Sequence, residues 1–154
     1  MRAFEGKMFD VVVEDGNEVV VHGPAVAIVA VDRDRQVTLV RQQRAGAGGP
    51  LLELPAGGVE AGDSPLDTAH RELREETGLH GGDWTAVAAF FTTPGFCDEK
   101  MHLFLARDVV EGDAEPEDDE ELELVRVPLD EVAALLPEIE DAKTLAGLLL
   151  LLQL

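Results

Sequence analysis

The residues from Gly57 to Leu79 read GGVEAGDSPLDTAHRELREETGL and carry the strongest structural signal in the chain. Ser64 is a favoured cap for a helix N-terminus, and Pro65 suits the first helical position because its missing N–H needs no partner there. Good helix formers follow, and Gly78 readily adopts the left-handed conformation that ends a helix. The sequence therefore predicts a helix over residues 66–77.

Three carboxylates share one side of this helix. At 100° per residue, Glu72, Glu75 and Glu76 fall within an arc of roughly 100°. A helix rich in Glu and Arg is usually a solvated surface helix, but like charges three and four residues apart repel unless a cation relieves them. Magnesium and manganese prefer such oxygen ligands. The neighbouring apolar stripe, which we expect to face the core, consists of Leu66, Ala69 and Leu73.

The wider spacing resembles the Nudix box, G-x5-E-x7-R-E-U-x-E-E-x-G-U. Gly57 and the run Arg71–Leu79 match its fixed positions, and Asp63 stands where the box has its first glutamate. The resemblance implies an α+β protein with the Nudix fold, in which a mixed β-sheet is sandwiched between α-helices (α/β/α). It also implies a pyrophosphatase that depends on Mg²⁺ or Mn²⁺. Asp63 keeps the charge of the glutamate with a shorter reach.

The same resemblance implies roles for individual residues. Glu72 and Glu76 would be the main metal ligands, Glu75 would assist a second ion, and the carbonyl of Ala56 would complete the coordination. Glu75 and Glu76 are thereby catalytic candidates as well. Arg71 would orient the carboxylates through charge-assisted hydrogen bonds. A metal suits this chemistry because it neutralises a diphosphate that otherwise repels an attacking oxygen.

Strands are expected on both sides of the helix. Ala25–Val31 is an apolar run typical of a buried strand, while Val11–Val13 and Val19–Val21 flank a turn, as in a hairpin. Further strands are predicted over residues 37–41, 51–54, 85–91, 101–106 and 122–127, and helices over 129–136 and 140–152. This order predicts a mixed sheet with helices packed on it. We expect a single domain over residues 1–154, because this length suits one core.

Segments outside the box are similar to the ADP-ribose pyrophosphatase branch of the family. They are Val40–Arg44, Leu52–Gly57, Thr93–Lys100 and Asp141–Leu148. This resemblance implies hydrolysis of ADP-ribose to AMP and ribose 5-phosphate, with arginines at phosphate or ribose and glutamates at hydroxyl or adenine groups. The candidate substrate-binding residues are Arg41, Arg44, Glu53, Phe96 and Glu99.

The branch also places a general base on a loop before a late strand. The acidic run Glu117–Glu121 precedes the strand predicted at 122–127, and alignment with the branch favours Glu120. Without the resemblance, this run is a solvated loop. Glu120 is therefore the third catalytic candidate, with Glu117 and Glu121 as the alternatives in a shifted register.

The composition of the chain limits the classes of molecule that it is expected to bind. The chain has 32 acidic and 12 basic residues and a formal net charge of -20, a field that repels nucleic acid and anionic membranes. Its apolar runs are far shorter than the roughly 20 residues of a membrane helix, and its start lacks a signal-peptide pattern. The single cysteine, Cys97, suits a reducing compartment. We therefore expect a cytoplasmic protein that binds a small nucleoside diphosphate derivative, and neither nucleic acid nor membrane.

The family resemblance further implies a homodimer. In that arrangement the N-terminal strands within residues 1–22 contact a second copy, with Phe4, Phe9 and Val11–Val13 as candidates for the contact. The four histidines show no metal-ligand spacing, so no role is predicted for them.

Other functions are compatible with the sequence. A Nudix pyrophosphatase of different specificity would cleave another nucleotide sugar or an oxidised nucleoside triphosphate. A non-catalytic Nudix module would bind a nucleotide without cleaving it, although such a module has no reason to keep three crowded carboxylates. A purely structural, charge-rich protein is the remaining alternative.

Overall fold

The computed structural model describes residues 1–112 and 122–154. A small sheet contains β1 (Arg2–Glu5), β2 (Asp10–Glu14) and β3 (Asn17–Val21). A larger sheet contains β4 (Ala25–Asp32), β5 (Gln36–Arg44), β6 (Gly49–Glu53), β7 (Ala56–Gly58), β8 (Leu79–His80), β9 (Asp83–Phe91), β10 (Lys100–Glu111) and β11 (Glu123–Pro128). The helices are α1 (Pro65–Thr77), α2 (Val132–Leu135) and α3 (Ala142–Leu151), with short 3₁₀ turns at Ala45–Ala47, Leu129–Glu131 and Leu136–Glu138. None of the helices in these described ranges is long and apolar enough to cross a membrane.

The larger sheet mixes parallel and antiparallel pairs. Its main order is β11-β5-β4-β10-β8, with β6 paired to β5, β7 to β4 and β9 to β10. β4 and β10 run parallel, in a register that joins Ala25 to Met101 and Val31 to Arg107. The other pairs of this sheet are antiparallel. The mixed sheet predicted from the sequence is confirmed.

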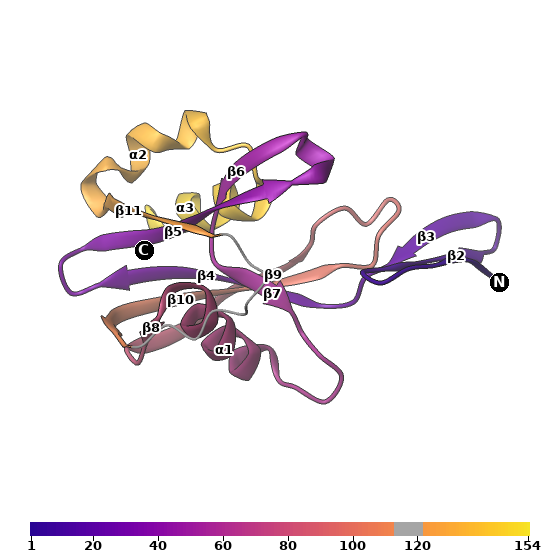
Figure 1. Cartoon of the computed structure of the whole chain (residues 1–154), viewed down its shortest axis with the longest axis horizontal. Helices are drawn as coiled ribbons and strands as arrows, with labels where there is room; N and C mark the ends of the chain where they lie inside the picture. Colours follow the sequence, from indigo (N-terminus) through magenta and orange to yellow (C-terminus); the bar gives the residue numbers. More distant parts are fainter. Residues whose placement is uncertain (113–121) are drawn as a thin grey trace.

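The central strand β4 is buried on both faces. Because side chains alternate along a strand, Ala27 and Val29 join one apolar cluster while Val26 and Ile28 join another. The first cluster contains residues of α3, and the second contains residues of α1. Figure 1 shows the corresponding layers, with α1 on one side of the sheet and α2 and α3 on the other. This is the α/β/α arrangement expected from the sequence.

Helix α1 begins and ends at the predicted signals. The Ser64 hydroxyl accepts a hydrogen bond from the Asp67 amide at 3.1 Å, and Gly78 has a φ of 74°. Ala69 and Leu73 are fully buried as predicted, but the prediction for Leu66 was wrong because that side chain is 41% exposed. Leu66 lies in the first turn, and the apolar cluster on this face does not extend to it.

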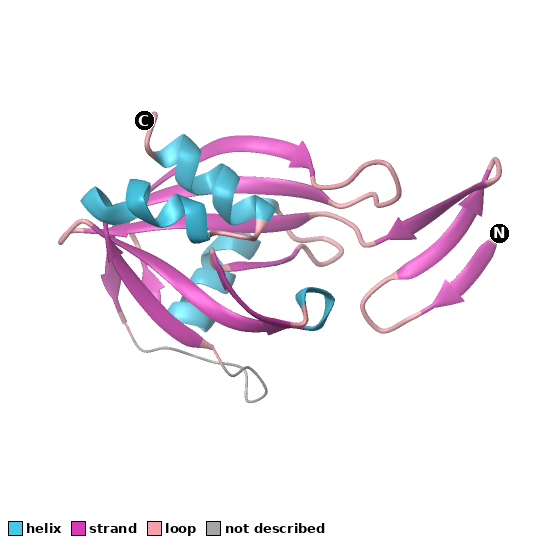
Figure 2. Cartoon of the chain, turned by 90° about the horizontal axis from the view of Figure 1, so that it is seen from above, coloured by secondary structure: helices cyan, strands magenta, loops and turns pink. Residues whose placement is uncertain are grey.

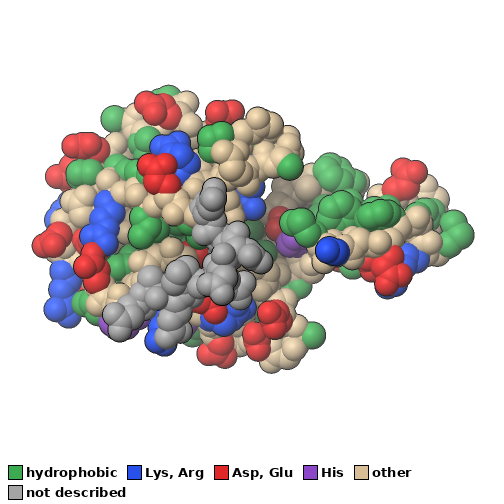
Figure 3. Space-filling model, viewed as in Figure 1, with side chains coloured by type: hydrophobic (Ala, Val, Ile, Leu, Met, Phe, Trp, Pro, Cys, Tyr) green, Lys and Arg blue, Asp and Glu red, His purple; other side chains and the backbone are tan. Residues whose placement is uncertain are grey.

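The small N-terminal sheet projects from the body of the molecule (Figures 1 and 2). Its β2–β3 hairpin is the predicted one, with Asp15 and Gly16 at positive φ in the turn. β3 is tied to the loop at residues 93–98, since the Val20 amide donates to the Phe96 carbonyl at 2.7 Å. Apolar side chains gather on this sheet in Figure 3. Its exposed large apolar residues are Met1, Phe4, Met8, Phe9 and Val21.

Candidate active site

The turn between β6 and α1 brings backbone and carboxylates together. β7 pairs with β4 through Gly57 and Val26, and α1 packs against both strands. A Cβ added to Gly57 would overlap the carboxylate of Glu72 and lie 2.6 Å from its Oε2 atom. The glycine is therefore required for the Glu72 carboxylate to lie against β7. One turn further along α1, Glu76 Oε2 accepts a hydrogen bond from the Ala56 amide at 3.1 Å.

Arg71 is shared by two of the three predicted carboxylates. Its Nη1 atom lies 3.0 Å from Glu72 Oε1 and 3.2 Å from Glu75 Oε2. Burial by itself would lower the pKa of Arg71, but the charges of Glu72, Glu75 and Glu60 outweigh burial and raise that pKa. The expected orienting role of Arg71 thus has a geometric basis, and Glu60 is an acid beside it that the sequence argument did not single out.

The carboxylate oxygens on this side of α1 are ligands of the kind that a hard divalent cation prefers. Glu72, Glu75 and Glu76 supply carboxylate oxygens around the Ala56–Gly58 strand, and side-chain exposures of 14% for Glu72 and 25% for Glu75 leave them partly shielded from water. Within residues 1–112 and 122–154, no group of three His, Cys, Asp or Glu side chains is already drawn together to hold a metal ion. The space left by the absent Cβ of Gly57 keeps the backbone of β7 accessible to the Glu72 carboxylate. The candidate ligands therefore lie along one side of α1 beside β7, with Arg71 among them, and are not yet gathered into a coordination site.

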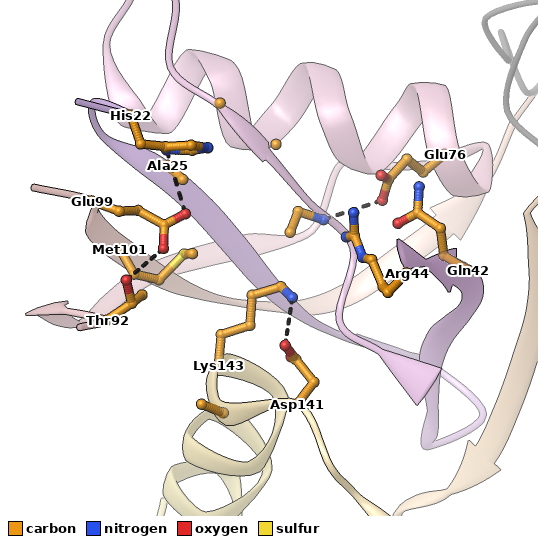
Figure 4. A pocket seen from close by; sticks show the side chains of 14 residues that line it. His22, Ala25, Gln42, Arg44, Glu76, Thr92, Glu99, Met101, Asp141 and Lys143 are labelled. Carbon is orange, nitrogen blue, oxygen red and sulfur yellow. Dashed lines mark hydrogen bonds and ion pairs between the residues drawn. The ribbon is translucent and has the colours of Figure 1, made fainter. Parts of the chain in front are cut away.

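Two hollows share the Ala56–Gly58 strand as a wall. One, of about 410 Å³, is lined by Glu72, Glu75 and Arg71. The other, of about 390 Å³, reaches from Glu76 to Glu99 (Figure 4). The side chains that line this second hollow include His22, Gln42, Arg44, Thr92, Asp141 and Lys143. A ligand in this hollow would therefore meet the carboxylate of Glu76 at one end and the Arg44 and Lys143 cations along the wall.

Arg44 is fixed by a carboxylate that is itself buried. Glu53 is 1% exposed, and its two oxygens accept from Arg44 Nε at 2.7 Å and Arg44 Nη2 at 2.8 Å. Lys143 Nζ donates to the same carboxylate at 2.6 Å. Burial alone would raise the pKa of Glu53, but the hydrogen bonds from Arg44 and Lys143 outweigh it and hold that pKa below its ordinary value. Both oxygens of Glu53 are engaged by cations of the protein, and its predicted role in substrate binding stays a prediction.

A second polar group lies at the far end of the hollow. Glu99 accepts from the Thr92 hydroxyl at 2.6 Å and lies 3.6 Å from His22 Nδ1. Asp98 accepts from the backbone amides of His22 and Gly23 at 2.7 and 3.0 Å. Burial alone would raise the pKa of Asp98, but these hydrogen bonds outweigh it and lower that pKa. The predicted candidate Glu99 therefore lines the hollow, together with His22, for which the sequence predicted no role.

Other predicted site residues do not meet in this hollow. Arg41 lies 3.3 Å from Glu123 and lines a separate surface hollow, because residues three apart on a strand point to opposite faces. The Phe96 residue is 58% exposed and does not line the hollow between Glu76 and Glu99. Glu120 lies outside the described residues, so its role as general base stays a prediction.

Residues that the sequence argument missed come from distant parts of the chain. Lys143 is 90 positions from Glu53, and the Asp98 carboxylate reaches the amide of His22 across 76 positions. No local spacing connects such partners. Only the similarity of residues 141–148 to a known branch gave any sign that Asp141 and Lys143 lie near the site.

Comparisons with known proteins agree with this geometry. The model of the NUDIX domain family matches residues 21–148. The chain is 40% identical to the ADP-ribose pyrophosphatase of Bacillus subtilis (strain 168), over 92% of this chain and 83% of that protein. It is 37% identical to the methanol dehydrogenase activator of Bacillus methanolicus, over 82% of this chain and 71% of that protein.

A solved structure shows the same fold. The crystal structure of an ADP compounds hydrolase superposes with a TM-score of 0.81 at 26% identity, covering 99% of this chain and 89% of that chain. Enzymes of the family that these matches indicate use divalent metal ions. Because the family model matches residues 21–148 and the solved structure has the same fold, the chain belongs to the NUDIX domain family.

Proposed function

We propose that the protein hydrolyses the pyrophosphate of ADP-ribose, in the presence of Mg²⁺, to AMP and ribose 5-phosphate. One observation carries the proposal: the 390 Å³ hollow joins the Glu76 carboxylate on α1 to the cations Arg44 and Lys143. A diphosphate needs cationic groups along its length and a cluster of metal-binding oxygens at the bond that breaks. Resemblance to the ADP-ribose pyrophosphatase of Bacillus subtilis supports the choice of substrate.

The residues of the box hold the metal in this proposal. Glu72, Glu75 and Glu76, with the carbonyl of Ala56, bind Mg²⁺, or Mn²⁺ in its place. When bound, such an ion neutralises the diphosphate and lowers the pKa of water. Arg71 fixes the direction of Glu72 and Glu75 through its ion pairs at 3.0 and 3.2 Å.

Arg44 and Glu99 contact the substrate at separate points. The bidentate pair with Glu53 uses two of the five N–H donors of Arg44, so further donors are available to a phosphate oxygen. Glu99 is suited to accept from ribose hydroxyls at the other end of the hollow, where His22 and Thr92 also lie. Arg41 and Phe96 lie outside this hollow and stay candidates for substrate binding on the basis of the branch resemblance.

Hydrolysis transfers one proton and exchanges one phosphorus–oxygen bond. Water attacks a phosphorus of the diphosphate, the bridging P–O bond breaks, and its electron pair leaves with the departing phosphate. We assign the acceptance of the water proton to Glu120, on the basis of the branch resemblance. Glu75 and Glu76 are the other catalytic candidates, through the ions they hold.

The proposal also covers the oligomeric state of the protein and its place in the cell. We propose a cytoplasmic homodimer in which the single Nudix domain of residues 1–154 contacts a second copy through the strands within residues 1–22. The exposed side chains of Phe4 and Phe9, 52% and 41% accessible, support this contact because large apolar groups on a projecting sheet favour burial. The proposed partners are the substrate and the second copy, without nucleic acid or membrane.

Product analysis tests the reaction. Incubation with ADP-ribose and Mg²⁺ should release AMP and ribose 5-phosphate in equal amounts, and ADP-glucose, FAD and 8-oxo-dGTP in parallel reactions should be turned over more slowly. The Glu76→Gln variant should retain its fold and lose at least about 100-fold in kcat. Faster cleavage of another substrate would reassign the specificity, while binding of ADP-ribose without AMP release would indicate a non-catalytic module.

A further inference from the structure

A buried carboxylate with two cationic partners lies behind the wall of the hollow. Glu53 is almost fully buried, and a carboxylate in that position is stable only when it is paired and hydrogen-bonded. Arg44 supplies a bidentate pair from β5, and Lys143 supplies an ammonium from the first turn of α3. The ammonium also donates to Asp141 Oδ1 at 2.9 Å. Lys143 thus joins two carboxylates, of which Asp141 lines the hollow.

The charges of this group balance. Arg44 and Lys143 contribute two positive charges, and Glu53 and Asp141 contribute two negative charges. Without the ammonium, a net negative charge would remain beside the hollow, in surroundings where the Lys143 side chain is only 12% exposed and water screens charges weakly. An incoming diphosphate would then be repelled by the same group of residues that holds Arg44.

Docking of α3 depends on different atoms. The Asp141 carboxylate accepts from the Thr144 amide at 2.9 Å and caps the helix. The Thr144 hydroxyl in turn accepts a hydrogen bond from the Leu54 amide at 2.8 Å. This bond ties α3 to the segment between β6 and β7. These bonds do not involve the ammonium. The charge of Lys143 can therefore be changed while the helix cap and its tie to Leu54 are kept.

We propose that Lys143 is a positioning residue that neutralises Glu53 and Asp141, so that the Arg44 guanidinium remains available to the diphosphate of the substrate. This inference rests on the proposed function of the hollow. Lys143 lines the hollow with its ammonium held by Glu53 and Asp141, so its positive charge acts on the substrate through the charge balance of this group. Removing the charge should weaken substrate binding, and restoring the balance elsewhere in the group should recover it.

Calorimetric titration with ADP-ribose in EDTA tests the inference, because no turnover interferes there. Lys143→Met should raise Kd about tenfold, within the range of coupling between neighbouring charges, whereas Lys143→Arg should stay close to the unaltered protein. Asp141→Asn keeps a good helix cap while removing one negative charge, so it should lower Kd several-fold. The double variant Lys143→Met with Asp141→Asn should return to within about threefold of the unaltered Kd.

A matched control separates this role from general effects. Lys100→Met removes another lysine charge, one that lies over the ring of Phe91 and outside the hollow, and should leave Kd nearly unchanged. Thermal melting of each variant reports the fold. An unchanged Kd in Lys143→Met, or a double variant as weak as Lys143→Met at equal melting temperature, would overturn the inference.

The outcome for the unaltered protein distinguishes the two proposals. Binding of ADP-ribose in EDTA without AMP release in Mg²⁺ would overturn the proposed reaction and leave the charge-balance inference to stand on the Kd series. AMP release by the unaltered protein in Mg²⁺, together with an unchanged Kd in Lys143→Met, would overturn the inference and leave the proposed reaction standing.

Discussion

Replacing Gly57 by alanine should separate the activity of the protein from its stability. The added Cβ would overlap the Glu72 carboxylate; its contact with Oε2 alone, at 2.6 Å against an ordinary 3.4 Å, requires the carboxylate to move by at least about 0.8 Å. A displacement of about 1 Å in a positioned group costs on the order of 100-fold in rate, equivalent to about 2.7 kcal/mol of transition-state stabilisation. We therefore expect kcat for ADP-ribose in Mg²⁺ to fall by about 100-fold.

The same variant should fold normally. Gly57 does not have a positive φ, and the atoms that the Cβ meets are the end of a flexible side chain. Alanine is compatible with that backbone, so the free energy of unfolding in urea should change by less than about 1 kcal/mol. Gly49→Ala, with open space around its Cβ, is the control and should keep kcat within about twofold. A Gly57→Ala enzyme with unchanged kcat would refute the argument that the Glu72 carboxylate must lie against β7.

Three further predictions concern other parts of the molecule. Glu53→Gln should lower the free energy of unfolding at pH 7 by about 3 kcal/mol, because it leaves the largely buried ammonium of Lys143 and the half-buried guanidinium of Arg44 without their carboxylate. Since the folded-state pKa of Glu53 is below its ordinary value of 4.5, this difference from the unaltered protein is present above that pH and should shrink as the pH falls further, which urea titrations at pH 7 and pH 3.5 would measure. Glu120→Gln should cut kcat at least about 100-fold with the fold retained; full activity in this variant, with loss in Glu117→Gln or Glu121→Gln, would show that the base lies at another position. Replacing both Phe4 and Phe9 by serine should convert a dimer to a monomer in light scattering, and an unchanged mass would exclude this face as the contact.

Local signals explain how much of the fold was predictable. The Ser64 cap and the Gly78 stop act within one turn of the helix, so α1 followed from neighbouring residues alone. The continuous apolar run of β4 indicated burial on both faces, and the two apolar clusters confirm it. β7 and β8, with three and two residues, were missed because pairing with a distant strand defines them, and so short a stretch has no periodicity of its own.

The site residues also fall into two groups, those that local spacing could predict and those that depend on distant contacts. Glu72, Glu75 and Glu76 were found because they share one face of one helix. The branch resemblance made Glu53 a substrate-binding candidate, but its burial beside Lys143, 90 positions away, could not be inferred from local spacing. His22 was missed for the same reason, since its neighbours Glu99 and Asp98 follow it by more than 70 positions. Contacts between distant segments leave no pattern in a single sequence.

The local arrangement of charged side chains at the site favours binding of a diphosphate, and this effect outweighs the repulsion from the net negative charge of the chain. A chain with a formal charge of -20 repels phosphates at long range, but that field is screened over about 8 Å at physiological ionic strength. Within the site, Glu72 and Glu75 outnumber Arg71, which favours an added cation. Around Glu53 the charges balance, which permits an added anion. A diphosphate accompanied by its metal ion presents the complementary order of charges, so the local arrangement selects the substrate class.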